Sequence, residues 1–199
     1  MQWNWRKWLD RVRRFISLRS NLLALIPRIL VLFLLVGAVA LCPMTSASEG
    51  TPLDISLPLR GLKISDIHDT FDQVREGTRR HEATDIMAPR GAPVVAVNDG
   101  KIVKLFLSKP GGNTIYQFDP SERYCYYYAH LDHYADGLAE GRIVHRGDTI
   151  GFVGSTGNAD PSAPHLHFEI HILDPEKRWY QGTAINPYPY LVNALRLAK

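Results

Sequence analysis

Polar and apolar residues alternate most regularly in residues 164–172, which read PHLHFEIHI. Successive side chains of an extended chain point to opposite faces. One face of this segment therefore carries Leu166, Phe168, Ile170 and Ile172, and the other carries His165, His167, Glu169 and His171. This is the pattern of a half-buried β-strand. Neutral imidazole is the commonest protein ligand for metals, so the polar face indicates either a metal or catalytic site or a solvated strand face without special chemistry.

Short apolar segments separated by turn residues follow one another from residue 94 onward. The segments are 94–97, 101–107, 114–118, 124–131, 142–144 and 148–153. Turn-forming stretches such as Asn98-Asp99-Gly100 separate them, which is typical of consecutive antiparallel strands. Residues 136–140 are expected to form a helical turn, and Phe71 and Val74 are expected to pack in the interior. The pattern predicts a mostly β, antiparallel fold with a two-sheet, sandwich-like arrangement.

The first 48 residues follow a different pattern. Ile29–Cys42 is uncharged, and it follows a basic, aromatic segment and precedes small residues at 45–48. This order is typical of a secretory signal peptide, and an apolar stretch counted from Leu22 is also about long enough to remain as a membrane-spanning helix. The basic residues before the apolar run keep the N-terminus in the cytoplasm. We therefore expect the remaining chain outside the inner membrane, in the periplasm.

These patterns divide the chain into four parts. Residues 1–48 are expected to be a signal peptide or membrane anchor that contributes an N-terminal apolar helix. Residues 49–60 are expected to be a linker, residues 61–192 the β domain, and residues 193–199 a C-terminal tail.

Charge and cysteine content exclude some classes of protein. Seven of the 23 basic residues but only one of the 20 acidic residues lie in the first 48 positions. The remaining chain is slightly acidic, so the formal net charge of +3 does not indicate a nucleic-acid-binding surface. Only Cys125 lies in the expected domain, with Cys42 in the apolar run, so no disulfide framework is predicted.

Two further segments offer candidate functional side chains. His81 and Asp85 lie four residues apart, followed closely by Pro89, so a long metalloprotease helix with a second histidine is not expected. The pair belongs either to a loop that enters a strand and presents one imidazole and one carboxylate to a metal, or to an ordinary solvated loop. His130 ends a predicted strand, where alternation places it on the same face as Tyr126 and Tyr128.

In combination and order, these segments resemble the lysostaphin/LytM-type zinc metallopeptidases, which cut peptidoglycan peptides. The matching motifs are His81-x-x-x-Asp85, Tyr128-Ala129-His130-Leu131 and His165-Leu166-His167-Phe168-Glu169. The resemblance continues through Gly147-Asp148-Thr149-Ile150-Gly151 and closes at Asn186–Leu191, so that it covers residues 68–191.

The resemblance implies a duplicated hybrid motif fold and one zinc ion (Zn²⁺) per chain, held by His81, Asp85 and His167. Three protein ligands and a water are the open coordination of a catalytic zinc. The resemblance makes His130 and His165 the catalytic residues, which would orient the water, move its proton and stabilise the oxyanion. The implied function is a hydrolase: an exported endopeptidase for stem peptides or cross-links of cell-wall peptidoglycan. The implied partners are this peptide substrate and, through the N-terminal segment, the inner membrane, but no nucleic acid.

The sequence departs from the family pattern at two places. Ala83 stands where the family commonly has glycine, and the segment 157–164 before the His-Leu-His strand is longer than usual, which bears on substrate preference. A non-catalytic relative that binds and activates a cell-wall amidase is the alternative function, and such relatives lose ligands that this chain retains.

The remaining polar candidates have lesser expected roles. Glu169 is expected to support the site by hydrogen bonding rather than bind metal, and His171 to take no part. Asn113 is a candidate groove residue, and Tyr126 and Tyr128 either line the groove or pack in the interior. The other histidines, His68, His133 and His145, are expected on the surface.

Overall fold

A computed structural model of the protein describes residues 53–75 and 78–197. The expected signal peptide or anchor helix at residues 1–48 lies outside the described residues. Among the helices that are described, none is both long and apolar enough to cross a membrane.

The described part of the chain contains a 3-10 helix, nine β-strands and an α-helix, in the order η1, β1–β9 and α2. Their bounds are η1 (Ile64–Asp66), β1 (Thr84–Met87), β2 (Pro93–Val95), β3 (Gly100–Ser108), β4 (Gly112–Phe118), β5 (Tyr124–Tyr134), β6 (Ile143–Val144), β7 (Thr149–Val153), β8 (His165–Ile172), β9 (Thr183–Ile185) and α2 (Tyr188–Leu197).

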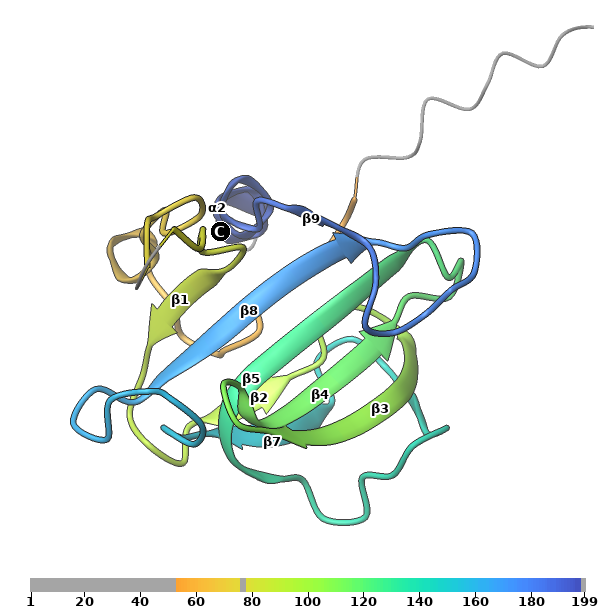
Figure 1. Ribbon diagram of the computed structural model, residues 1–199, viewed down its shortest axis with the longest axis horizontal. Coiled ribbons are helices and arrows are strands. Elements are labelled where there is room, and N and C mark those ends of the chain that lie inside the picture. Colours follow the sequence, from red (N-terminus) through yellow and green to blue (C-terminus); the bar gives the residue numbers. More distant parts are fainter. Residues whose placement is uncertain (1–52, 76–77, 198–199) are drawn as a thin grey trace, which may run out of the picture. The chain divides into compact units, whose positions relative to one another are not determined.

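All of these strands belong to one hydrogen-bonded antiparallel sheet, whose main path is β1-β8-β5-β4-β3-β6 (Figure 1). β9 pairs with β8, and β2 pairs with β7. The sheet branches at β5, because residues 124–129 pair with β8 whereas Leu131, His133 and Tyr134 pair with β7. The structure therefore confirms a mostly β, antiparallel fold. It does not confirm two separate sheets, since hydrogen bonds connect all the described strands.

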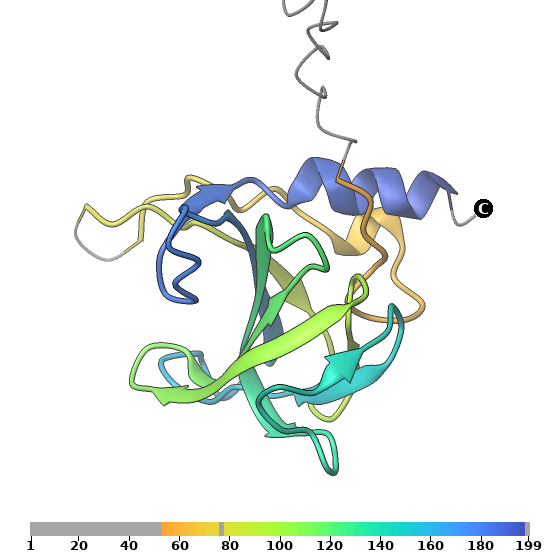
Figure 2. The ribbon, with the colours of Figure 1, turned by 90° about the vertical axis from the view of Figure 1, so that its right-hand side faces the viewer.

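The apolar core lies on the face of β8 and β5 that points away from the histidines. Leu166, Phe168 and Ile170 of β8 are fully buried there, beside Tyr126 and Tyr128 of β5. In Figure 2, which shows the main sheet near its edge, β7 lies on one side and the β8–β9 connection on the other. Burying each large apolar side chain stabilises the fold by about 1.5–3 kcal/mol. A slip of one residue would expose this whole set, so the apolar face of β8 also fixes the position of its polar face.

Three described elements were not predicted from the sequence, namely η1, β9 and α2, and β1 corresponds to the strand in one of the two alternatives for His81 and Asp85. Just before α2, the Asn186 side chain accepts a hydrogen bond from the Tyr188 backbone N–H at 2.9 Å. Within α2, Leu191 and Leu195 pack on the core. Residue 193 therefore lies inside this helix rather than at the start of a separate tail. Part of the expected linker also packs on the core, because Ile55 and Leu59 are buried.

Two local predictions are wrong. Val74 does not pack in the interior, since 71% of it is exposed. Residues 136–140 form hydrogen-bonded turns rather than a helix, with one bond from Leu138 N–H to the Ala135 carbonyl at 3.0 Å.

Candidate metal centre

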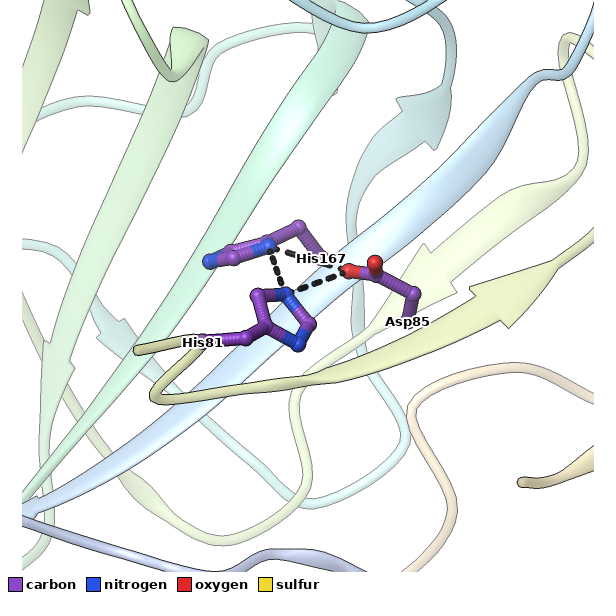
Figure 3. A group of neighbouring side chains, drawn as sticks. All are labelled: His81, Asp85 and His167. Carbon is purple, nitrogen blue, oxygen red and sulfur yellow. Dashed lines mark hydrogen bonds and ion pairs between the residues drawn. The ribbon is translucent and has the colours of Figure 1, made fainter. Parts of the chain in front are cut away.

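The three residues predicted as metal ligands lie together on the polar face of β8 (Figure 3). His81 precedes β1, and Asp85 of β1 is paired with His167 of β8. Asp85 Oδ1 lies 3.1 Å from His81 Nε2 and 3.0 Å from His167 Nδ1, and the two nitrogens are 3.2 Å apart. Two imidazole nitrogens and one carboxylate oxygen are a donor set that binds transition metals, zinc among them.

The backbone carbonyl of Thr70 determines which nitrogen His81 presents. His81 Nδ1 lies 2.8 Å from this oxygen. A carbonyl only accepts hydrogen bonds, so Nδ1 carries the hydrogen and Nε2 keeps its lone pair. The guanidinium of Arg75, 3.2 Å from the same Nδ1, therefore cannot donate to it. His81 is 5% exposed, and its lone pair points into the cluster.

Asp85 divides its two oxygens between different partners. Oδ2 accepts a hydrogen bond from Arg75 Nη2 at 2.5 Å, which leaves Oδ1 for the two imidazoles. The Thr70 hydroxyl accepts the Asp85 backbone N–H at 2.9 Å. Burial raises the pKa of Asp85, but the hydrogen bond from His167 and the positive charge of that ring outweigh burial and hold the pKa far below its usual value. Asp85 is therefore a carboxylate at any physiological pH.

His167 presents to the cluster the other ring nitrogen from the one that His81 presents. Its Nε2 donates to Glu169 Oε1 at 2.8 Å, so Nδ1 faces the cluster. Burial lowers the pKa of His167, but hydrogen bonds with Asp85 and Glu169 raise it to about 9. Without a metal, Nδ1 therefore carries a proton that points at Asp85, and a bound metal would replace this proton. Glu169 thus supports His167 by hydrogen bonding, as predicted.

His130 reaches the site because β5 is irregular at this position. Its φ angle is +59°, which is uncommon for a residue other than glycine, and the pairing of β5 with β7 shifts register just beyond it. Regular alternation would put His130 on the face of Tyr126 and Tyr128, as the sequence led us to expect. That expectation is wrong. The His130 ring lies 4.9 Å from the ring of His165 and 5.4 Å from that of His167, between centroids.

Both predicted catalytic histidines are anchored by carbonyls at Nδ1. His130 Nδ1 donates to the Thr156 carbonyl at 2.8 Å, and His165 Nδ1 donates to the Ala163 carbonyl at 2.9 Å. In the neutral form of each ring, the lone pair is therefore on Nε2. Burial lowers the pKa of His130 to about 4, so this ring is neutral at pH 7. His165 Nε2 lies 3.9 Å from Asp85 Oδ1, beyond hydrogen-bonding distance.

The structure also places the remaining candidate residues. Tyr126 and Tyr128 pack in the core. The side-chain amide of Asn113 donates to the Leu131 and Asp132 carbonyls and so ties β4 to β5. The histidines expected on the surface are exposed: His68, His133 and His145. His171, which was expected to take no part, contacts Glu169, with 2.6 Å between His171 Nε2 and Glu169 Oε2.

A pocket of about 180 Å³ adjoins the cluster and gives a ligand access to it. Its lining consists of Arg79, Arg80, His81, Glu82, His167 and Glu169. A larger pocket of about 260 Å³ elsewhere, between Lys101 and His145, contains none of the predicted site residues. The grouping of donor atoms, rather than pocket size, therefore identifies the candidate site.

Comparison with known proteins places these residues in a family. The model of peptidase family M23 matches residues 79–187, which include every residue of the cluster and both neighbouring histidines. The chain belongs to peptidase family M23. It is 36% identical over 120 residues to the L-Ala–D-Glu endopeptidase of Bacillus subtilis, an alignment that covers 58% of this chain and 35% of that protein. The chain spans about a third of the length of the curated relatives that it matches first.

The structure of this chain is also similar to solved structures of peptidases. The catalytic domain of lysostaphin from Staphylococcus simulans aligns with a TM-score of 0.54 at 31% identity and covers 63% of this chain and 91% of that one. A zinc-containing peptidase from Vibrio cholerae aligns with a TM-score of 0.50 at 28% identity, over 61% and 35% of the two chains.

The family motifs do not reveal every residue that shapes the site. Thr70 and Arg75 both contact the cluster, yet they lie in a segment without regular polar or apolar spacing. The carbonyls of Thr156 and Ala163 orient the two catalytic candidates through backbone atoms, which leave no signal in side-chain chemistry. None of these four contacts leaves a recognisable pattern in the sequence.

Proposed function

We propose that this M23 protein is a zinc-dependent endopeptidase that hydrolyses peptide bonds in peptidoglycan stem peptides or cross-links, with His81, Asp85 and His167 as zinc ligands and His130 and His165 as catalytic residues. The observation that carries the proposal is the cluster of two imidazole nitrogens and one carboxylate oxygen, with two more histidines beside it whose Nδ1 atoms are held by backbone carbonyls.

The donor set fits a catalytic zinc ion. Three donors supplied by His, Asp and His leave a fourth position for water or substrate, as in catalytic zinc sites. The carbonyl of Thr70 and the carboxylate of Glu169 hold the two imidazoles from the far side, which is the usual support for zinc ligands. When bound, zinc polarises the peptide carbonyl and lowers the pKa of water toward ~7.

His130 and His165 can move protons next to that position. Each Nε2 atom can accept a proton from the attacking water and, once protonated, donate it to the oxyanion or to the leaving amine. The low pKa of His130, caused by burial, keeps this ring in the accepting form at neutral pH. The hydrogen bonds to Thr156 and Ala163 prevent the rings from turning away during the reaction.

The substrate class rests on the relatives. One relative in sequence is named an L-Ala–D-Glu endopeptidase, and one similar solved structure is that of the antimicrobial peptidase lysostaphin. We propose a peptide of the cell wall as the substrate here. The basic and apolar pattern of residues 1–48 supports export to the periplasm or anchoring in the inner membrane, where such a substrate is found.

A non-catalytic regulator of a cell-wall amidase is the competing function. A regulator of this kind needs the groove but not the donor atoms. Because all five functional positions are present and lie together in the structure, we favour the enzyme.

The test combines metal analysis with digestion of purified peptidoglycan by the full chain. We expect about one zinc per chain and release of muropeptides that identify a cleaved peptide bond. A folded protein that binds zinc at no site and cuts nothing, yet raises the activity of an amidase, would contradict the proposal.

A further inference from the structure

Two hydrogen bonds join three polar side chains along β8. Glu169 Oε1 accepts from His167 Nε2 at 2.8 Å, and Glu169 Oε2 accepts from His171 Nε2 at 2.6 Å. Same-face neighbours on a strand are about 6.6 Å apart, so a glutamate between two histidines can reach both. The result is a continuous chain from His171 through Glu169 to the His167 ring.

We propose that His171 is a positioning residue of the metal centre, which acts on His167 through Glu169. This inference rests on the proposed function in that the cluster must hold zinc. It extends that function by assigning a role to a residue outside the motif residues and outside the ligand set.

The first hydrogen bond sets the orientation of the ligand. With its hydrogen on Nε2 and donated to Glu169, His167 can offer only Nδ1 to the metal. The plane of the ring is fixed at the same time, and a face-to-edge contact with the Tyr127 ring, 6.0 Å between centroids, supports it from β5.

The second hydrogen bond sets the orientation of Glu169. The terminal torsion of a glutamate side chain is broad, so a carboxylate with one partner can turn and weaken its bond to His167. His171 binds the other oxygen and thereby fixes the carboxylate plane. The side chains of His167, Glu169 and His171 are only 17%, 18% and 23% exposed, so water competes little with these bonds.

The neighbouring strands leave space for the His171 ring. Cys125 of β5 and Ala184 of β9 are paired with His171 on its two sides. Paired residues of adjacent strands project to the same face, and both of these side chains are small. A bulky residue at either position would compete with the imidazole for the place from which it reaches Glu169.

The experiment compares His171→Leu and His171→Gln in the full chain, with His145→Leu and His145→Gln as matched controls. Leucine removes the hydrogen bond, whereas the glutamine amide can still donate to Glu169. His145 is an exposed histidine outside the cluster, 3.6 Å from Asp99. Zn²⁺ affinity is measured by competition with a chromophoric chelator, and the absorption spectrum of the Co²⁺ form reports the ligand geometry.

We expect His171→Leu to weaken Zn²⁺ binding about tenfold, the lower end of the range for residues that support metal ligands, and to shift the Co²⁺ spectrum. His171→Gln should stay close to wild type, and neither control should change. Peptidoglycan cleavage by His171→Leu should largely recover at saturating Zn²⁺.

Unchanged Zn²⁺ affinity in a folded His171→Leu protein would overturn the inference. So would equal weakening in the Leu and Gln variants together with a lower unfolding temperature of the metal-free protein, because that result indicates a structural role. If wild type binds Zn²⁺ but cuts nothing, the proposed function fails, while the affinity comparison still decides the role of His171.

Discussion

The strands β8 and β5 both supply histidines to the candidate site, but they do so by different means. β8 alternates regularly, so its apolar residues fill the core and its polar residues face the cluster. β5 brings His130 to the same face only because a backbone φ of +59° interrupts its alternation. Regular strand geometry therefore suffices to place His165 and His167 on β8, whereas the position of His130 on β5 depends on a local departure from it.

The largest expected effect comes from removing the ligand on β8. His167→Ala should abolish stoichiometric zinc binding and reduce peptidoglycan cleavage by about 10³-fold or more, since the metal is expected to supply several kcal/mol of transition-state stabilisation. Metal analysis of the purified variant and quantified muropeptide release check this outcome. Retained zinc with retained activity would remove His167 from the ligand set.

Replacing His130 on β5 should reduce catalysis without removing the metal. We expect His130→Ala to keep its zinc and to lose about 10²–10⁴-fold in kcat, the usual contribution of a positioned acid or base. His133→Ala, an exposed histidine on the same strand, is the control and should retain full activity. Loss of zinc from His130→Ala would show that His130 takes part in metal binding and would contradict the role proposed for it.

Zinc affinity should depend on pH through the proton on His167. In the metal-free protein, burial is outweighed by the carboxylates of Asp85 and Glu169, which raise the pKa of His167 to about 9. Zinc must displace this proton, so affinity rises with pH below that value, by about tenfold per pH unit for one proton. Dissociation constants measured at pH 6, 7 and 8 should therefore fall, and a pH-independent constant would contradict the displacement of a His167 proton by zinc.

The smallest effect is expected from a substitution at Gly112, beside the backbone of Thr156 that supports His130. A methyl group at Gly112 would overlap Thr156, whose carbonyl anchors His130, whereas a methyl group at Gly141 would meet no neighbour. Both glycines have positive φ, so Gly141→Ala controls for backbone strain. We expect the free energy of unfolding of Gly112→Ala to fall by about 1–3 kcal/mol more than that of Gly141→Ala. Denaturant unfolding measures both, and equal losses would argue against a tight fit at Thr156.

Sequence alone predicted the regular part of this molecule. The alternation in β8 gave the correct strand and the correct core face, because a period of two is a direct consequence of extended backbone geometry. The antiparallel strands β3, β4, β5 and β7 were likewise expected from apolar segments and turns. β9 was missed because it is short and owes its hydrogen bonds to β8.

The candidate site was predictable as residue types but not as geometry. Family resemblance named His81, Asp85, His130, His165 and His167, and the structure brings these five together. The positive φ at His130 carries no sequence signal, since histidine seldom adopts it. The hydrogen bonds of Thr70 and Arg75 form only when their segment folds against His81 and Asp85. The bond between His171 and Glu169, in contrast, joins same-face neighbours of β8.

The most direct test of the account is a crystal structure of the zinc-loaded protein with anomalous diffraction measured at the zinc edge. The account predicts one zinc peak at about 2.0–2.2 Å from His81 Nε2, an Asp85 oxygen and His167 Nδ1, with His130 and His165 beyond bonding distance. A zinc ion bound through His130 or His165, or through Nε2 of His167 on the Glu169 side, would contradict it.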